Sequence, residues 1–163
     1  MSLPIPVTED RTLQGRWVEL PGGVVANKLG TSSVVAIFNR ERVWVCNLTS
    51  DQDRIDLVNG MYEQSRVLFH NREVEVWIVY AEQNWVQGQR IVAFFEQRVP
   101  ATCIFKQVYR GPSFLEEGAQ VLVKKLVDGT VVAAVGRQDG VGSHVLLQDR
   151  TTAVSTEIGI RFV

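Results

Sequence analysis

The residues best suited to chemistry gather in one glycine-rich stretch, residues 126–149, with the sequence LVDGTVVAAVGRQDGVGSHVLLQD. It contains His144, one of only two histidines in the chain, together with Asp139 and Asp149. Glycines and acidic residues at this density occur in phosphate-binding loops, in metal sites and in series of tight turns. The first two kinds of site would give the protein a reactive centre, whereas the third would not.

A phosphate-binding loop is the first alternative, and the glycine spacing argues against it. A dinucleotide-binding loop places G-x-G-x-x-G between a strand and a helix, because the helix N-terminus holds the pyrophosphate. Gly136, Gly140 and Gly142 instead form G-x-x-x-G-x-G, and the following HVLLQD has the apolar pattern of a strand. The chain also lacks the GK[ST] of a Walker loop. The stretch therefore does not predict a nucleotide site.

A metal site is the second alternative. Catalytic zinc uses three protein ligands, usually including two or three histidines, and the only other histidine, His70, lies in a predicted turn. A calcium loop needs acidic residues at alternating positions around a glycine, whereas RQDGVGS offers one aspartate. The run TSDQDRID, with Asp51, Asp53 and Asp56, lacks the central glycine and closing glutamate of such a loop. We therefore expect no bound metal and no cofactor.

Tight turns explain the stretch best. Asp-Gly is the preferred pair for a two-residue hairpin, because glycine adopts a positive φ without steric cost. Asp128-Gly129 and Asp139-Gly140 each join two short apolar runs. The stretch therefore predicts a three-stranded antiparallel meander, formed by Val121–Val127, Thr130–Val135 and Ser143–Leu147.

Other catalytic arrangements find little support in the chain. Ser143 and His144 are adjacent in a predicted strand, so their side chains face opposite ways, and no G-x-S-x-G elbow occurs. The carboxylate pairs Glu9-Asp10 and Glu116-Glu117 are typical of solvated turns. We predict that the protein is not an enzyme, and a small β-fold enzyme acting through His70 or His144 is the third-ranked alternative.

Composition indicates the class of protein that carries these residues. A chain of 163 residues suggests one domain, large enough to fold without a disulfide or a metal. The formal net charge is −1 and there is no basic stripe, which disfavours direct nucleic-acid binding. The chain shows no signal-peptide pattern and no apolar run of about 18 residues, so we predict no membrane contact. A reducing cytoplasm would then keep Cys46 and Cys103 as free, buried thiols.

Short runs rich in valine and aromatic residues recur at intervals of about 8–12 residues, as in a sandwich or barrel. They predict an all-β fold, an antiparallel sandwich or partly closed barrel, with no helix of three turns. VEVWIV and RIVAFFE are apolar on both faces, so their strands are expected to be covered on both sides. The strands expected before residue 110 are Arg16–Leu20, Ser33–Phe38, Arg42–Leu48, Asp51–Val58, Gln64–Phe69, Val74–Ala81, Arg90–Glu96 and Thr102–Tyr109.

The beginning of the chain differs from the rest. Residues 1–12 alternate apolar side chains with Pro4 and Pro6, which favours an extended arm over a central strand. We therefore predict an N-terminal arm at 1–12 and a single β domain at 13–163, with a candidate subdomain boundary near 110–113.

Partner contacts are expected at both ends of the chain. The arm buries little surface by itself, so its ordering needs another surface to lie on. The last predicted strand has Ile160 and Phe162 on its apolar face and runs to the final residue, which leaves a sheet edge open for a partner.

The four tryptophans divide into two groups. Trp17, Trp44 and Trp77 fall in predicted strands, where core packing is expected, whereas Trp85 stands in the polar run EQNWVQGQ and would contact a partner. The predicted interface residues are therefore Leu3, Ile5, Val7, Trp85, Ile160 and Phe162.

Residues 116–149, EEGAQVLVKKLVDGTVVAAVGRQDGVGSHVLLQD, resemble the small β-rich decoration, or cement, proteins of tailed bacteriophage capsids. The shared features are a glycine-led strand, a D-G turn, a second glycine-rich turn and an apolar strand that ends in an acidic residue. The resemblance covers roughly a fifth of the chain. It implies an oligomeric β-domain, often a trimer, that bridges capsid subunits from outside and has no catalytic residues.

The predicted function is therefore that of a non-enzymatic virion structural protein, most specifically a capsid decoration protein. It would be made in the host cytoplasm, assemble as a homo-oligomer, with a trimer favoured, and bind capsid or other virion proteins. A neck or tail component of a phage particle is the nearest alternative. A β-barrel that binds a small molecule or glycan through Trp85 and neighbouring aromatic residues is the alternative from another class.

Overall fold

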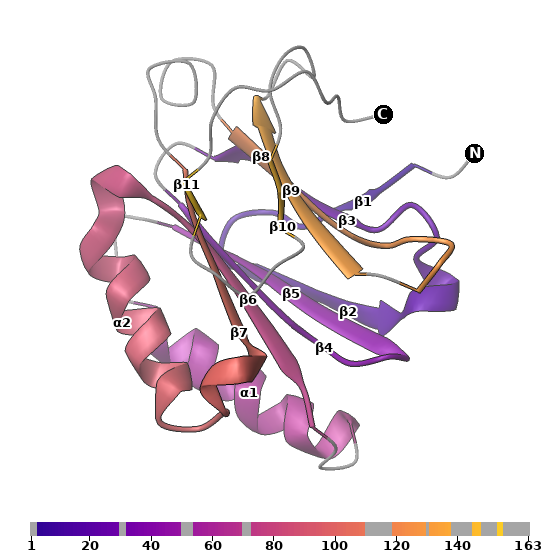
Figure 1. Cartoon of the computed structure of the whole chain (residues 1–163), viewed down its shortest axis with the longest axis horizontal. Coiled ribbons are helices and arrows are strands. Elements are labelled where there is room, and N and C mark those ends of the chain that lie inside the picture. The colour runs from indigo at the N-terminus through magenta and orange to yellow at the C-terminus, as the bar shows by residue number, and fades with distance from the viewer. Residues whose placement is uncertain are drawn as a thin grey trace.

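The chain folds into three layers, with two β-sheets packed face to face and two helices on the outer face of one sheet (Figure 1). Figure 1 shows the computed structural model. The residues that it describes are 3–29, 32–49, 54–69, 73–109, 119–129, 131–137, 145–147 and 153–154.

The central layer is a six-stranded mixed sheet in the order β11-β7-β6-β4-β5-β2. The pairs β2/β5, β4/β5 and β4/β6 are antiparallel, whereas β6/β7 and β7/β11 are parallel. Its strands are β2 (Arg11–Arg16), β4 (Ser33–Phe38), β5 (Arg42–Leu48), β6 (Glu75–Ala81), β7 (Ile104–Tyr109) and β11 (Ala153–Val154).

The outer sheet has five strands in the order β1-β3-β8-β9-β10. Strand β1 runs parallel to β3, and the remaining pairs are antiparallel. Its strands are β1 (Ile5–Pro6), β3 (Val24–Leu29), β8 (Ala119–Lys125), β9 (Val131–Arg137) and β10 (Val145–Leu147).

The strands β8, β9 and β10 confirm the meander expected from the glycine-rich stretch. Gly129 has φ +92° and its N–H donates to the Leu126 carbonyl, so Gly129 is the last residue of a turn that starts at Leu126. The expected two-residue Asp128-Gly129 turn is therefore wrong, since the last pair of the hairpin is Lys125 with Val131. The second expected turn, Asp139-Gly140, lies outside the described residues.

The helices are α1 (Ile55–Leu68) and α2 (Trp85–Glu96), and three short 3-10 turns are η1 (Trp17–Glu19), η2 (Glu82–Asn84) and η3 (Ala101–Cys103). Helix α2 joins β6 to β7, because two parallel neighbours need a crossover connection. Both helices lie on the same side of the six-stranded sheet (Figure 1).

Strand β4 shows why the central sheet is buried on both faces. Val35 and Ile37 face the helices and belong to the core between helices and sheet. Val34, Ala36 and Phe38 alternate with them and belong to the core between the two sheets. The strand therefore has no polar face, as the apolar run in its sequence indicates.

The prediction of a mainly β protein is confirmed, but the expectation that no three-turn helix occurs is wrong. The segments expected as strands Asp51–Val58 and Gln64–Phe69 overlap α1, and the expected strand Arg90–Glu96 lies within α2. The predicted strands Ser33–Phe38 and Arg42–Leu48 are confirmed with the same bounds.

The error in α1 has a local cause. Asn-Gly is a strong signal for a hairpin turn, and Asn59-Gly60 directly follows the expected strand Asp51–Val58, yet Gly60 lies in the helix with open space where a Cβ would be. The buried residues Val58, Met61 and Ser65 recur every three or four positions, which is the period of one helix face. The Asn-Gly signal outweighed that period in the prediction.

The expected antiparallel arrangement and the partly closed barrel are also corrected. Both sheets contain parallel pairs, and neither closes on itself. The expected strand Arg16–Leu20 is instead the end of β2 followed by η1, and β3 was not predicted. A parallel pair needs a long crossover connection, which between β6 and β7 is α2, so the missed helix also concealed the parallel β6/β7 pair.

The segment predicted as an arm takes part in both sheets. Ile5 and Val7 donate their N–H groups to the Gly23 and Val25 carbonyls, and β2 begins at Arg11. The domain boundary expected near 110–113 lies outside the described residues.

Candidate functional site

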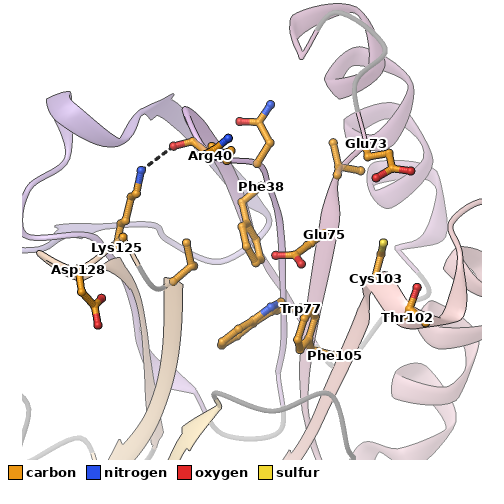
Figure 2. A pocket seen from close by; sticks show the side chains of 14 residues that line it. Phe38, Arg40, Glu73, Glu75, Trp77, Thr102, Cys103, Phe105, Lys125 and Asp128 are labelled. Carbon is orange, nitrogen blue, oxygen red and sulfur yellow. Dashed lines mark hydrogen bonds between the residues drawn. The ribbon is translucent and has the colours of Figure 1, made fainter.

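An open cleft of about 870 Å³ lies between the two sheets, at the end where β6 and β7 begin (Figure 2). Four segments that are distant in sequence form its walls. They are the end of β4 with the turn after it, the start of β6, the start of β7, and the β8–β9 hairpin. A volume of this size falls in the range of small-molecule sites.

Three aromatic rings form the floor of the cleft. The ring centroids of Phe38 and Trp77 are 5.7 Å apart in an edge-to-face arrangement, and those of Trp77 and Phe105 are 5.1 Å apart. The three side chains are only 2%, 3% and 5% exposed, so the rings offer little of their surface to the cleft. Within the described residues, the buried Nε1 of Trp77 has no hydrogen-bond partner.

Charged side chains of opposite sign line the two sides. Glu75 begins β6 with its side chain toward the other sheet, because the next residue, Val76, packs against the helices. Glu73 lies two positions earlier, at the rim of the cleft. Lys125 ends β8 on the side opposite, and its Nζ donates to the Arg40 carbonyl at 2.7 Å. Figure 2 shows Lys125 across the cleft from Glu73 and Glu75.

A second hollow, of about 270 Å³, adjoins the cleft and shares Glu73, Val74 and Cys103 with it. Its other lining residues include Arg98, whose guanidinium carbon lies 3.7 Å from the centre of the Phe94 ring. Arg98 Nη1 also donates to the Phe94 carbonyl, so this side chain is held against α2.

A polar cluster occupies the opposite end of the central sheet. Ser33 Oγ and Asn84 Nδ2 both donate to Gln87 Oε1 at 2.7 Å, and Gln87 Nε2 donates to the Thr49 carbonyl at 2.8 Å. An amide is not a general base, so Gln87 does not activate the Ser33 hydroxyl as a nucleophile. The cluster ties α2 to the ends of β4 and β5.

The two cysteines are free and differ in burial. Burial raises the pKa of the Cys46 thiol from 9.0 to about 12, although a hydrogen bond with the Val35 backbone acts in the opposite direction. Cys46 is therefore protonated and unreactive at neutral pH. Cys103 is half-buried and borders both hollows.

Four of the six predicted interface residues are described, and they lie in different surroundings. Leu3 and Ile5 are 79% and 38% exposed, and Trp85 is 57% exposed at the start of α2. Val7 is buried in the core between the sheets of its own chain. Ile160 and Phe162 lie outside the described residues.

The burial expected for the other tryptophans is confirmed, since Trp17, Trp44 and Trp77 are all buried. The Glu9-Asp10 pair lies in a turn with Glu9 exposed, as expected, and both carboxylates accept hydrogen bonds there. Ser32 Oγ donates to Glu9 Oε1, and Asp10, at φ 56°, accepts a hydrogen bond from the Thr49 N–H at 3.0 Å.

Most of the residues considered for metal binding or catalysis lie outside the described residues. Within the described ranges, no group of three or more His, Cys, Asp or Glu side chains could hold a metal ion. Asp56 lies in the first turn of α1. The residues of this group that lie outside the described ranges are Asp51, Asp53, His70, Glu116, Glu117, Asp139, Gly140, Gly142, Ser143, His144 and Asp149.

The cleft was not predicted from the sequence. Glu75 and Trp77 stand two positions apart in a strand, which places them on one face, and that signal was present in VEVWIV. The partner wall at Lys125 comes from the other sheet, and the chain shows no local pattern that links the two.

Compared with known proteins, the chain matches no family model, no curated protein and no solved structure. In the part of the chain that the structure describes, no helix has the length and apolar character needed to cross a membrane.

Proposed function

We propose that this protein is a non-enzymatic structural protein of a virion, and most specifically a capsid decoration protein. The observation that carries the proposal is the exposure of Ile5 on the edge strand β1 and of Leu3 just before it, since both present apolar side chains outward while β1 pairs within its own chain. Ordered apolar side chains at a sheet edge form a ready contact for a neighbouring subunit. The sequence resemblance of residues 116–149 to phage decoration proteins points to the same role.

The contact at β1 is made by side chains and not by an added strand. Ile5 and Val7 direct their N–H groups inward to β3, so Pro4 and Pro6 occupy the positions whose N–H groups would point outward. Proline has no N–H, and the outer edge of β1 therefore lacks donors for another strand. The partner packs on Leu3 and Ile5 instead.

The assembly is tested by light scattering of the full chain and of the double variant Leu3→Ser/Ile5→Ser. The variant leaves the buried Val7 in place, so the core is preserved. A homo-oligomer, with a trimer favoured, weakens in this variant. The control is Val18→Ser, a change of the same kind at an exposed valine on η1. A monomer at all concentrations, or equal effects in variant and control, contradicts assembly through β1.

The place in a virion is tested separately, by mass spectrometry of gradient-purified particles from cells that carry the gene. Peptides of this protein co-purify with intact particles at a fixed ratio to the capsid subunit. Their position on the capsid or at the neck and tail, seen by electron microscopy with a tagged chain, separates decoration from the neck or tail alternative. Particles without the protein contradict the virion role.

A second function, binding of a small molecule or glycan at the surface, is favoured by Trp85 and its neighbour Val86, both exposed on the first turn of α2. An exposed indole offers a face for stacking on a sugar ring. A glycan array probed with the full chain and with Trp85→Ala tests it. Glycan signals that the variant keeps would contradict this function.

A further inference from the structure

We propose that the free edge of β2 binds a second copy of this chain, with the two β2 strands paired antiparallel about a two-fold axis at Leu13. Strand β2 is the last strand of the central sheet, and among the described strands it pairs with β5 alone (Figure 1). The contact goes beyond the proposed assembly. It uses backbone groups of the central sheet, whereas that assembly uses side chains at β1 of the outer sheet.

The odd-numbered residues of β2 bond to β5. The Trp17 N–H donates to the Glu41 carbonyl at 2.8 Å, and these two residues continue the register in which Arg16 lies opposite Arg42. Residues along an antiparallel pair alternate between hydrogen-bonded and non-hydrogen-bonded positions. The even-numbered residues of β2 therefore direct their N–H and C=O groups away from β5, toward the free edge.

Two of the even-numbered residues have unused backbone groups at this edge. Arg16 donates its N–H to Glu19 Oε2 at 3.3 Å, so this donor is already occupied. Thr12 and Gln14 are both exposed, and within the described residues their N–H and C=O groups have no hydrogen-bond partner. A strand edge with unpaired donors and acceptors is a template for another strand.

The other described sheet edges are shorter than β2, and one is blocked. Strands β1 and β11 have two residues each and β10 has three, and Pro4 and Pro6 leave the outer edge of β1 without N–H donors. Strand β2 has six residues and no proline, and its two charged residues, Arg11 and Arg16, stand at its ends. Sheets commonly protect a long edge with prolines or central charges. The centre of β2 has neither, which favours an edge that is paired.

The free groups select one register for the two copies. When Leu13 lies opposite its own copy, Thr12 faces the partner's Gln14, and every free N–H of these residues meets a carbonyl. A register centred on Gln14 would instead place Thr12 opposite the partner's Arg16, whose N–H already binds Glu19. The axis therefore passes through Leu13.

The side chains fit the same register. Leu13 packs partly against the core between the sheets, and the partner's Leu13 would extend that apolar contact across the axis. Arg11 lies opposite the partner's Gly15, which has no side chain to obstruct it. The register places no arginine opposite another arginine, so like charges are kept apart. The edge is thus complementary to a second copy of itself.

Sedimentation velocity tests the contact with the variants Gln14→Pro and Gln14→Ala. Proline removes the outward N–H of residue 14 and leaves the bonds to β5 intact, whereas alanine keeps that N–H. The unchanged chain and Gln14→Ala dimerise with a similar dissociation constant below about 100 μM, and Gln14→Pro weakens the dimer at least about tenfold. Circular dichroism confirms that both variants fold. Each measurement is repeated in Leu3→Ser/Ile5→Ser, which keeps the β2 dimer, so failure of the β1 contact and failure of the β2 contact are distinguishable.

Disulfide formation places the axis. A non-hydrogen-bonded antiparallel pair brings its Cα atoms to about 4.5 Å, a distance that a disulfide spans. In a Cys103→Ser background, Leu13→Cys therefore links two chains on mild oxidation. The control Arg11→Cys, on the same face, does not, because its own copy lies four residues, or about 13 Å, further along the partner strand. A monomer at about 100 μM, a Gln14→Pro dimer as tight as that of Gln14→Ala, or a cross-link at residue 11 and not at 13 would overturn the proposal.

Discussion

At the residue scale, substitution by alanine is expected to change the free energy of unfolding in opposite directions at two glycines. A Cβ at Gly88 would overlap the ring of Tyr80, which packs under α2, whereas a Cβ at Gly60 meets nothing within 4 Å. Gly88→Ala should therefore lower the free energy of unfolding by about 1–3 kcal/mol through overpacking. Gly60→Ala should raise it by about 0.5–1 kcal/mol, because alanine loses less conformational entropy in a helix. Urea unfolding of both variants checks the pair, and a stabilising Gly88→Ala would contradict the close contact.

The raised pKa of the buried Cys46 thiol is expected to make the folded protein less stable at alkaline pH. Its pKa is about 12 in the folded protein and 9.0 in the unfolded chain, so the folded state holds the proton more tightly. The contribution is fully present below pH 9.0 and is lost as the pH rises toward 12. In Cys46→Ala, the free energy of unfolding should fall less steeply over this range, by up to about 1.4 kcal/mol per pH unit. Equal slopes in the two proteins would show that Cys46 does not ionise on unfolding.

At the scale of elements, secondary structure was predictable where polar turn residues separate short apolar runs. VEVWIV and RIVAFFE are both continuous apolar runs, yet the first is β6 and the second lies in α2. Runs this short fit a doubly covered strand and a buried helix equally well. The buried Gly88 and Ile91, which lie three positions apart on α2, show the helical period that the run itself conceals. The bounds of β4 and β5 are confirmed because the polar turn Asn39-Arg40-Glu41 separates two runs rich in β-branched and aromatic residues.

The prolines at strand β1 are expected to keep the edge of the outer sheet from pairing with other chains. Pro4 and Pro6 remove the outward N–H groups, so Pro4→Ala/Pro6→Ala would restore two donors at the edge. The variant should form larger assemblies than the unchanged protein as concentration rises, in a sedimentation-velocity series. Pro21→Ala, in the turn before β3, is the matched control and should leave the distribution of masses unchanged. A double variant that sediments like the unchanged protein would show that the edge is blocked by something else.

The candidate cleft belongs to the scale of the whole molecule, and this is why no local pattern predicted it. Glu75 begins β6 and Lys125 ends β8, so they stand on different sheets, and α2 and β7 lie between them in the sequence. The side to which each residue points can be read from the sequence, because side chains two positions apart in a strand share a face. Glu75 therefore shares a face with Trp77, and Lys125 with Val123. Their meeting depends on how the two sheets pack and on where the strands end. Neither was known from the sequence, since the layer of helices and the parallel β6/β7 pair were not predicted.

The shared central sheet predicts a single unfolding transition for the described layers. Strand β4 contributes Ile37 to the core under the helices and Val34 to the core between the sheets, so neither core can open while the other stays intact. Ile37→Val should cost about 0.5–1.5 kcal/mol, and Val34→Ala about 1–3 kcal/mol. Far-ultraviolet circular dichroism follows the helices. Tryptophan fluorescence follows Trp17 and Trp77 between the sheets when Trp44 and Trp85 are replaced by phenylalanine. The two probes should give coincident curves in both variants. Separate midpoints for the two probes, most of all in Val34→Ala, would show that the outer sheet unfolds alone and that the chain holds two cooperative units.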